Sequence, residues 1–435
     1  MGENGTTDGS DAFSRPANIS GLIMSISNIT GKQIIGITVI CLVIYLWYHY
    51  CKQHVKQPPR IHHHSSELVA TWWSGSSINT TRGRIKWHRR QSNTLPNQAV
   101  SRIILVNGWV RDPNNWDVYL PQDYNNDRVE WSHVPSSSTG RILLLVSGTN
   151  RLVAKQELWD YLQIHYGPGT AGSLAIPTFN LLDPKQVSQL IKQFKNESNQ
   201  QYIIKKNVQR QTGIKIIEKN NPEQIKSAIG QGFVVAQPLI TDTYLINNRK
   251  IGIRIYLCVI CYNGSLEGWV HPEGIIHFAQ DDYSNSTTES HITTGYVSPS
   301  FYTDNHYPQT VSELRRYLDR SNRLLSWSEK QRRKQGLLSN QLFNSIEQLI
   351  GKIMIPYKDQ LGKDKRYLHH LCVQMYGVDI GVRSDLTPYL VEINKGPDFN
   401  FKGEKEAAVK YSVMEDMFRL IGLLDNGIIS FKRVV

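Results

Sequence analysis

Apolar positions along the chain follow two kinds of pattern, and each pattern predicts a different kind of element. Short runs rich in Val, Ile, Leu and Tyr predict strands, which fall at residues 101–106, 141–146, 201–205, 213–218, 233–237, 250–261, 266–271 and 274–279. Apolar residues spaced three and four apart predict helices, at residues 155–165, 184–195, 313–362 and 405–424. Strands and helices mix without a regular β-α-β alternation, which predicts an α+β fold with several sheets.

The first 98 residues have a different pattern. Residues 34–48 (IIGITVICLVIYLWY) carry no charge, and with their flanks they predict a transmembrane helix over residues 33–50. Lys52, Lys56 and Arg60 follow this segment, whereas residues 1–32 contain only two basic residues. Because basic residues favour the cytosolic side, we expect a single-pass membrane protein with a short outer or lumenal N-terminus and a cytosolic body. Residues 51–98 are rich in polar residues and predict a linker.

The composition adds charge to this picture. The formal net charge is +12 and the pI is about 9.3, which favours an acidic partner. No nucleic-acid-binding motif accompanies the charge, so an acidic protein surface is the preferred partner over nucleic acid. The five cysteines are too few for a disulfide scaffold in a chain of this length. Basic residues gather in one helical region, where they fit either an acidic partner or a solvated helix face: Arg315, Arg316, Arg320, Arg323, Lys330, Arg332, Arg333 and Lys334.

Three oxygen-bearing side chains lie on two apolar runs near the C-terminus. Residues 389–394 (YLVEIN) predict a strand, and alternation puts Glu392 and Asn394 on one face of it. Asp379 lies in a similar run, residues 373–380 (VQMYGVDI). Two carboxylates and an amide on neighbouring strands suit Mg²⁺, which also takes water and phosphate oxygens. The same spacing also fits polar strand ends that face solvent.

Three further segments have the pattern of a nucleotide site. Lys205 ends a predicted strand and is followed by a polar stretch that reaches Gly213, an arrangement that can cover phosphates. Residues 233–240 (FVVAQPLI) can hold an adenine between domains. Lys250 and Arg254 share one face of a strand, as phosphate-binding cations would. Taken singly, the three segments also fit a hairpin, a core strand and an edge strand with protective charges.

In chain order, five segments resemble the tubulin–tyrosine ligase family of ATP-grasp ligases. They are residues 176–181 (IPTFNL), 202–214 (YIIKKNVQRQTGI), 234–256, 273–279 (EGIIHFA) with 291–293 (HIT), and 377–397. The resemblance covers about residues 140–424. It implies an ATP-grasp fold with an N-terminal subdomain at 99–150, a central one at 151–243, a C-terminal one at 244–425 and a tail at 426–435.

The resemblance also implies roles for individual residues. ATP would be bound by Lys205, Arg210, Gly213, Gln237, Leu239, Lys250 and Arg254. Mg²⁺ would be held by Asp379, Glu392 and Asn394. Lys250, Arg254 and His277 would act in catalysis, and His277 and Thr293 would contact substrate.

The implied reaction is the ATP- and Mg²⁺-dependent addition of an amino acid to a protein carboxylate through an acyl-phosphate, as in tyrosination, glutamylation or glycylation. Tubulin or another acidic protein would be the acceptor, and a free amino acid the donor.

This chain departs from the family pattern at several positions. Gly252 stands where the family has Asp, His277 where it has Arg, and Pro238 where the adenine hinge has Lys. Thr294 replaces the Asn of a Thr-Asn pair, and Gln211 replaces the first glycine of the phosphate loop. Two interpretations follow. The protein is a ligase with an altered donor or acceptor, or it is a nucleotide-binding protein with weak or no ligase activity that binds an acidic protein. The retained metal set favours activity.

Overall fold

The computed structural model describes the chain from residue 84 onward, with gaps. The described residues are 84–91, 94–135, 140–196, 200–206, 213–217, 223–284, 287–293, 301, 306–323, 337–424 and 427–435. All of them belong to one compact unit, Ser65–Val435. The predicted transmembrane segment, residues 33–50, lies outside these ranges, as does most of the predicted linker. Within the ranges, no helix combines the length and the apolar character needed to cross a membrane.

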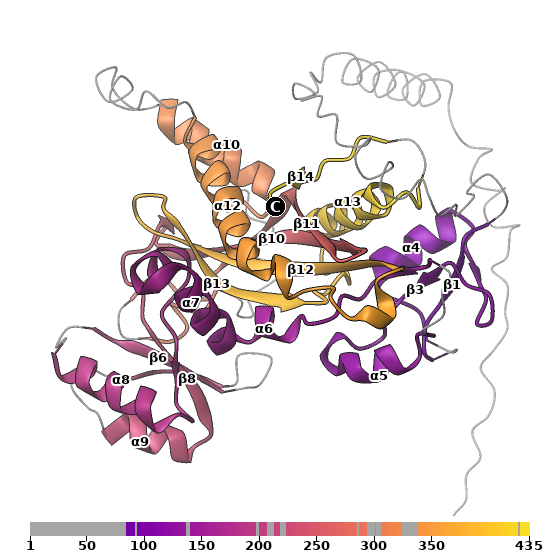
Figure 1. Ribbon diagram of the computed structural model, residues 1–435. Helices are drawn as coiled ribbons and strands as arrows, with labels where there is room; N and C mark the ends of the chain where they lie inside the picture. The colour runs from indigo at the N-terminus through magenta and orange to yellow at the C-terminus, as the bar shows by residue number, and fades with distance from the viewer. Residues whose placement is uncertain are drawn as a thin grey trace, which may run out of the picture. The chain divides into compact units, whose positions relative to one another are not determined.

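The described elements alternate irregularly along the chain (Figure 1). The strands are β1 (Lys86–His88), β2 (Val110–Arg111), β3 (Val118–Tyr119), β4 (Ile142–Leu143), β5 (Phe179–Asn180), β6 (Tyr202–Lys206), β7 (Ile214–Ile217), β8 (Phe233–Pro238), β9 (Leu245–Ile246), β10 (Arg249–Tyr262), β11 (Ser265–Phe278), β12 (Leu371–Val382), β13 (Pro388–Lys395) and β14 (Lys432–Arg433). The helices are α4 (Gln98–Val106), α5 (Asp127–Ser132), α6 (Asn150–Val153), α7 (Lys155–Leu174), α8 (Pro184–Asn196), α9 (Glu223–Gly230), α10 (Val311–Arg323), α12 (Leu338–Met354) and α13 (Glu404–Leu420). Short 3₁₀ turns are η1 (Tyr124–Asn126), η3 (Ile355–Asp359) and η4 (Lys365–Tyr367).

The described strands form two sheets, as the predicted α+β class requires. The larger is a ten-stranded mixed sheet in the order β14-β11-β10-β12-β4-β3-β1-β2, with β13 beside β12 and β9 beside β10. Its branching strand is β12. One edge of β12 pairs with β10, the start of its other edge pairs with β4, and the rest of that edge pairs with β13. The branch therefore joins the N-terminal strands to the long C-terminal hairpins in a single sheet.

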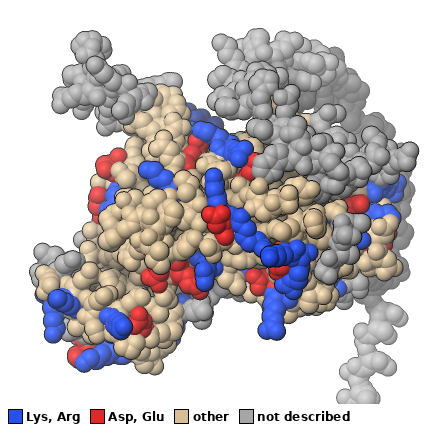
Figure 2. Space-filling model, viewed as in Figure 1, with Lys and Arg blue, Asp and Glu red and all other residues tan. Residues whose placement is uncertain are grey.

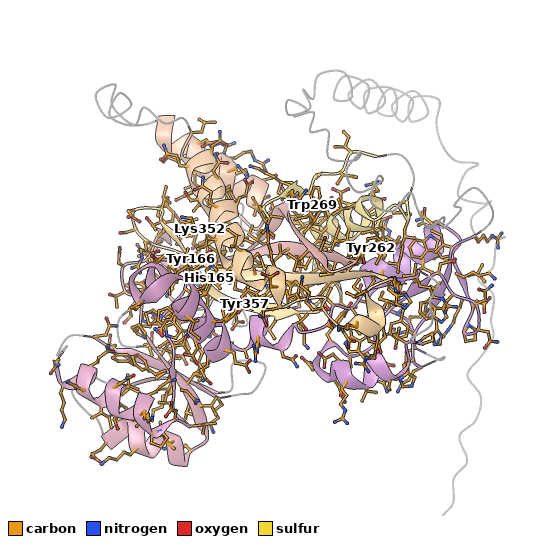
Figure 3. The ribbon with its side chains drawn as sticks, in the orientation of Figure 1. His165, Tyr166, Tyr262, Trp269, Lys352 and Tyr357 are labelled. Atoms are coloured by element: carbon orange, nitrogen blue, oxygen red, sulfur yellow. The ribbon has the colours of Figure 1, made fainter. Side chains whose placement is uncertain are left out.

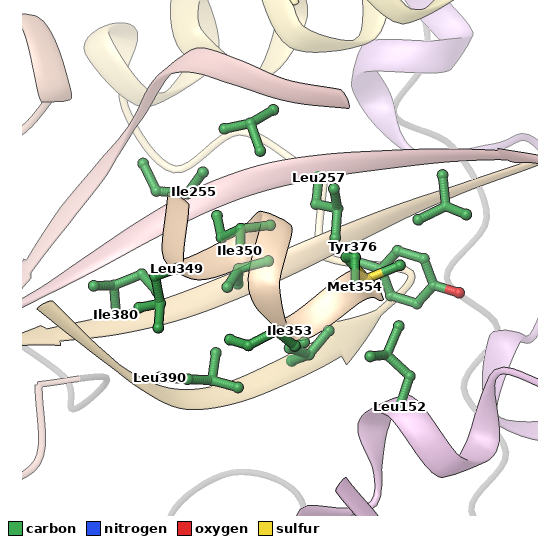
Figure 4. Close-up of a cluster of buried hydrophobic side chains, with 14 of the residues drawn as sticks. Leu152, Ile255, Leu257, Leu349, Ile350, Ile353, Met354, Tyr376, Ile380 and Leu390 are labelled. Atoms are coloured by element: carbon green, nitrogen blue, oxygen red, sulfur yellow. The ribbon is translucent and has the colours of Figure 1, made fainter. Parts of the chain in front are cut away.

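Both faces of the larger sheet are covered by helices. On one face α12 packs against β10, β12 and β13, where Ile350 and Ile353 meet Leu257 and Leu390 (Figure 4). On the same side, α7 is tied to the end of α12, because the Tyr166 hydroxyl donates to the Lys352 carbonyl at 2.7 Å (Figure 3). On the other face lie α4 and α13, which contribute to a second buried cluster.

The smaller sheet has four antiparallel strands in the order β5-β8-β6-β7. Helices α8 and α9 cover one of its faces (Figure 1), where Leu190, Ile225 and Ile204 are buried together. Because side chains alternate along β6, Lys205 points to the opposite face from Ile204. That opposite face carries the nucleotide-site candidates of this sheet.

The predicted strand at residues 101–106 is wrong, because these residues lie in α4. The Asn97 side chain caps this helix by accepting a hydrogen bond from the Val100 amide at 3.1 Å. The apolar residues that misled the prediction have helical spacing as well as β-branched character. The buried residues of α4 are Ala99, Val100, Ile103 and Ile104.

Two predicted flexible regions contain paired strands. Residues 86–88, assigned to the linker, form β1 with Trp87 buried. The segment has only two apolar residues, Ile85 and Trp87, among basic neighbours, which is too short a pattern to predict a strand. Residues 432–433, assigned to the tail, form β14 and pair with β11, and Phe431 is buried beside them.

The remaining strand predictions agree with the structure, with two differences in extent. The run 141–146 contributes only the two residues of β4, although residues 142–146 are all buried. The runs 266–271 and 274–279 form one strand, β11, which continues through Pro272. Pairing between β10 and β11 shifts register between Ile255 and Leu257, opposite this proline, and such an irregularity accommodates a residue without an amide hydrogen. The predicted subdomain boundaries stay predictions.

Candidate active site

The pairing of β12 with β13 brings the three candidate metal ligands together. Asp379 lies opposite Glu392, and Asn394 lies opposite Gly377 in the same ladder. The Asn394 amide nitrogen donates to Asp379 Oδ2 and to Glu392 Oε1, at 3.1 Å each. The predicted common face of Glu392 and Asn394 is therefore confirmed, and Asp379 joins them on it.

Two basic side chains balance the two carboxylates. The Arg254 guanidinium forms a bidentate pair with Asp379, with Nη2 at 2.9 Å from Oδ2. The Lys155 ammonium lies 2.6 Å from Glu392 Oε2. Arg254 lies over Gly377, where a Cβ atom would come within 3.0 Å of its side chain. The glycine thus leaves room for the arginine beside the metal-ligand candidates.

The surroundings separate the pKa values of the two carboxyl groups. Burial raises the pKa of Asp379, and the Glu392 carboxylate adds to this effect although Arg254 opposes it. Burial alone would raise the pKa of Glu392 too, but Lys155 and Lys205 outweigh it and hold that pKa at about 2. Glu392 is therefore ionised throughout the physiological pH range, which suits a metal ligand.

From the smaller sheet, Lys205 contributes a further cation near these groups. Its ammonium donates to Gln237 Oε1 at 2.8 Å, and the Gln237 amide donates to the Thr178 hydroxyl at 2.8 Å. Burial lowers the pKa of Lys205 to about 8, although the Glu392 and Asp379 carboxylates oppose the shift. Lys205 of the smaller sheet therefore lies close enough to Glu392 and Asp379 of the larger sheet for their charges to affect its pKa.

Lys250 lies on β10, on the same face as Arg254. Its side chain is buried, and burial lowers its pKa to about 8 with a further contribution from the Lys205 charge. The hydrogen bond from its ammonium to the Ile240 carbonyl is long, at 3.5 Å. Lys250, which is buried, and Lys205, which is half-buried, are thus two cations that an anionic ligand would stabilise.

The predicted adenine segment connects the two sheets. Gln237 and Leu239 are both buried, and the Leu239 amide donates to the Gln201 carbonyl at 2.7 Å. Pro238 between them has no amide hydrogen, so a base could use only its carbonyl. Gly213 follows the phosphate loop, and its carbonyl accepts from the Lys206 amide at 2.8 Å. Arg210 lies outside the described residues.

Two of the positions that depart from the family pattern, Gly252 and His277, lie together in a second part of the site, beside Lys250 and Arg254 on β10. Gly252 is the cross-strand partner of His277. A Cβ atom on Gly252 would lie 2.5 Å from the Thr293 hydroxyl oxygen, so Thr293 fills the space that a side chain at 252 would take. Burial and the nearby Arg254 lower the pKa of His277 to about 3. His277 is therefore neutral at pH 7 in this arrangement and does not supply the positive charge of an arginine.

The donor set fits Mg²⁺ better than a transition metal. The described residues contain no cluster of three or more His, Cys, Asp or Glu side chains that could hold a metal, at this site or elsewhere. The site instead offers two carboxylates and an amide, hard oxygen donors that leave positions for water and phosphate oxygens. Asp379, Glu392 and Asn394 would hold the ion.

Sequence reasoning missed Lys155 and Thr178. Lys155 begins α7, where its charge opposes the helix dipole. The sequence signal that could have identified Lys155 was a basic residue at a predicted helix start, where it is unfavourable. Its contact with Glu392 explains why a lysine stands there. Thr178 was quoted in a motif but given no role, because its hydrogen bond to Gln237 joins residues 59 positions apart.

Comparison with known proteins agrees with this geometry. A probable tubulin polyglutamylase of Rattus norvegicus is 23% identical over 196 residues, 43% of this chain and 38% of that protein. A probable alpha-tubulin polyglutamylase of Tetrahymena thermophila is 22% identical over 363 residues, 72% of this chain and 81% of that protein. A tubulin monoglutamylase of Homo sapiens is 23% identical over 250 residues, 55% of this chain and 20% of that protein.

The chain thus spans well under half the length of the rat and human relatives. The model of the tubulin-tyrosine ligase family matches residues 144–427, a continuous region that contains every candidate site residue named above. Since this match extends over more than half of the sequence, the chain belongs to the tubulin-tyrosine ligase family.

Proposed function

We propose that the protein is an ATP- and Mg²⁺-dependent ligase that joins an amino acid to a carboxylate of tubulin. One observation carries the proposal. Four basic side chains, from Lys155 on α7, Lys205 in the smaller sheet, and Lys250 and Arg254 on β10, surround a cluster of two carboxylates and an amide. Such an excess of positive charge around a hard-cation site suits the triphosphate of a Mg²⁺-bound nucleotide.

In the proposed reaction, the acceptor carboxylate attacks the γ-phosphorus of ATP, and ADP leaves. The amine of the donor then attacks the acyl-phosphate, and phosphate leaves as the new amide bond forms. Bound Mg²⁺ would neutralise charge on the phosphates. Arg254 and Lys250, on one face of β10, would stabilise the charge of the transferring phosphoryl group. Lys205 would hold the phosphates from the smaller sheet.

Glutamate is the donor that the relatives favour. The rat, ciliate and human relatives reported above carry names of tubulin glutamylases. Tyrosine and glycine remain the alternatives implied by the wider family. The acceptor would be an acidic segment of tubulin, because the chain has a net charge of +12.

The basic surface predicted to attract that segment is only partly within the described residues. On α10, Arg316 and Arg320 are exposed, whereas Arg315 stacks over the Phe343 ring at 4.0 Å. Lys330, Arg332, Arg333 and Lys334 lie outside the described ranges. Acidic and basic side chains are interspersed on the face shown in Figure 2, so attraction there would be local rather than uniform.

An incorporation assay tests the proposal. The full chain is incubated with Mg-ATP, tubulin and, in separate reactions, labelled glutamate, tyrosine or glycine. We expect glutamate to be incorporated and phosphate to be released in equal amounts. Glu392→Gln should abolish both, whereas Glu404→Gln, an exposed change of the same chemistry at the start of α13, should leave both unchanged. Incorporation that survives Glu392→Gln would contradict the assigned metal site.

The second candidate is a nucleotide-binding protein that attaches to tubulin without ligation. Gly252, whose side-chain space Thr293 fills, and the neutral His277 favour it, because the residues at 252 and 277 differ from the family pattern. Tight binding to microtubules and to Mg-ATP, with no incorporation of any of the three donors, would support this candidate and exclude the first.

We also propose that residues 33–50 anchor the protein in a membrane with its body in the cytosol. The structure provides a reporter for this topology. Asn263 begins a glycosylation sequon and is exposed in the two-residue Asn-Gly turn between β10 and β11. In cells, the proposed orientation predicts glycans at the N-terminal sequon of Asn18 and none at Asn263. A glycan at Asn263 would show that the orientation is the opposite of the proposed one.

A further inference from the structure

A cavity lies where α4, β12 and α13 meet on one face of the larger sheet. Its volume is about 310 Å³. The buried apolar residues of its lining include Val100, Leu144, Met375, Phe399, Met414 and Met417. They come from α4, β12, α13 and the segments that follow β4 and β13. The three methionines make a wall that adapts to aromatic or branched groups.

Arg89 is the basic residue that lines this cavity. Its side chain is only 5% exposed, yet Nε and Nη1 have no hydrogen-bond partner within the described part of the chain. Glu130, the carboxylate whose charge acts on Arg89, is already engaged by Arg90 Nε at 3.2 Å and the Tyr119 hydroxyl at 2.7 Å. Burial lowers the pKa of Arg89, an effect that Glu130 only partly offsets.

The acidic residue that lines the cavity does not balance Arg89. Asp398 is exposed, and its Oδ1 accepts a hydrogen bond from the Asn400 amide at 3.0 Å. No ion pair joins Arg89 to any carboxylate within the described ranges. A buried guanidinium without a partner is costly to the fold, and its planar fork matches a carboxylate in two parallel hydrogen bonds.

The cavity is distinct from the metal-ligand cluster but shares its framework. Met375, Gly377 and Asp379 alternate onto one face of β12, and Arg254 occupies the space over Gly377. The cavity begins at Met375, about 13 Å along the strand from Asp379 at roughly 3.3 Å per residue. Phe399, on its wall, stacks on Tyr256 at 5.3 Å between ring centres. Arg254 therefore stands between the two sites.

From this geometry we infer that the cavity binds a small organic carboxylate with an apolar or aromatic body, held by Arg89 against the methionine wall. The carboxylate can come from a free acid or from the C-terminal residue of a peptide. Both sources offer the same two oxygens to the guanidinium. The site requires neither ATP nor tubulin, so it stands independently of the proposed ligase activity.

A titration of the full chain with 4-fluorophenylacetate, followed by ¹⁹F NMR without nucleotide, tests the inference. The neutral 4-fluorophenylacetamide has nearly the same shape and no charge. We expect the acid to bind at least about tenfold more tightly than the amide, because the charge-assisted hydrogen bonds to Arg89 need a carboxylate. Arg89→Gln should remove that preference, whereas Arg128→Gln, on the exposed side of α5, should keep it.

The melting temperature separates binding from folding. If Arg89 serves a ligand, Arg89→Gln should leave the melting temperature unchanged or raise it, because an unpaired buried charge is removed. Met414→Trp fills the cavity without touching the charge and should also weaken binding of the acid. Equal binding of acid and amide, or undiminished binding by either variant, would overturn the inference.

A final pair of ligands assigns the source of the carboxylate. The peptide Gly-Gly-Phe is compared with its C-terminal amide in the same titration. Binding of the peptide acid that depends on Arg89 assigns the cavity to a chain terminus. Binding of 4-fluorophenylacetate alone assigns it to a free acid. Either result supports a carboxylate site.

Discussion

The two ends of the candidate active site differ in how their polar groups are balanced. At the metal end, Asp379 is paired with Arg254 and Glu392 with Lys155. At the opposite end, Gly252 carries no side chain and Thr293 fills the adjacent space. His277 there is neutral, because burial lowers its pKa to about 3. At the first end, a metal could replace the cations as partner of the carboxylates, and a polyphosphate could replace the carboxylates as partner of the cations. The second end presents neutral groups.

The difference shows which part of the reaction the fold is equipped for. Ion pairs at the metal end hold the carboxylates and cations close together before ligand arrives, and metal and phosphate would replace these contacts when they bind. Neutral groups at the other end bind by shape and hydrogen bonding. Under the proposed ligase function, the ATP-dependent chemistry would depend on the first end, and the choice of substrate on the second.

The largest expected effect comes from breaking the metal end. Asp379→Asn should reduce amino-acid incorporation by at least about 10³-fold, since the metal supplies several kcal/mol of transition-state stabilisation. It should also destabilise the fold by about 3–5 kcal/mol, because Arg254 loses its buried partner. Denaturant unfolding and the incorporation assay measure the two effects. The matched control is Asp359→Asn, whose side chain is 95% exposed.

A double variant tests whether the ion pair is the cause. Arg254→Met combined with Asp379→Asn should cost less stability than the sum of the single changes, because neither variant residue leaves a buried charge unpaired. Full additivity would mean that the two side chains do not stabilise one another.

The next effect is a pH dependence of nucleotide affinity. Lys205 and Lys250 each have a pKa lowered to about 8 in the free protein. Phosphate binding requires the protonated form, so raising the pH from 7 to 9 should weaken Mg-ATP binding by about tenfold for each lysine. The same shift makes the free protein more stable as pH rises above about 8, because the unfolded chain then holds protons that the folded chain has released.

Calorimetric titration with Mg-ATP at both pH values measures this dependence. Lys250→Met should halve the logarithmic change, while Lys226→Met, an exposed lysine of α9, should leave it intact. An affinity that does not vary between pH 7 and 9 would place both lysines away from the phosphates.

A smaller effect is expected at the neutral end. Gly252→Ala places a methyl group 2.5 Å from the Thr293 hydroxyl oxygen and should destabilise the protein by about 1–3 kcal/mol. Adding Thr293→Ala should recover most of this loss, as measured by thermal unfolding. If Gly252→Ala alone is as stable as the parent, Thr293 does not fill that space in solution.

The smallest effect should follow from His277→Gln. Because His277 is neutral at pH 7, its replacement removes no charge, and Mg-ATP affinity should change by less than about threefold, the size of an ordinary neutral hydrogen bond. A loss above tenfold that disappears at high pH would show instead that His277 is protonated when nucleotide is bound.

The metal ligands were the most predictable part of the site. Glu392 and Asn394 lie two residues apart on a strand, so alternation alone puts them on one face. Lys155 could not be found this way, because its contact with Glu392 depends on where α7 begins relative to β13. Local patterns also failed for α4, where β-branched residues predicted a strand. The segment is a helix, because Asn97 caps its start and its buried residues have helical spacing.

The sequence by itself determined most strand segments of the C-terminal half, the common face of the candidate metal ligands Glu392 and Asn394, and the family membership. These depend on short-range periodicity and on residues close in the chain. Tertiary structure alone decided the branching of the sheet at β12, the balance of charge around Asp379 and Glu392, the neutral state of His277 and the unpaired Arg89. Each of these depends on burial and on pairing between segments far apart in the chain, which local sequence patterns do not encode.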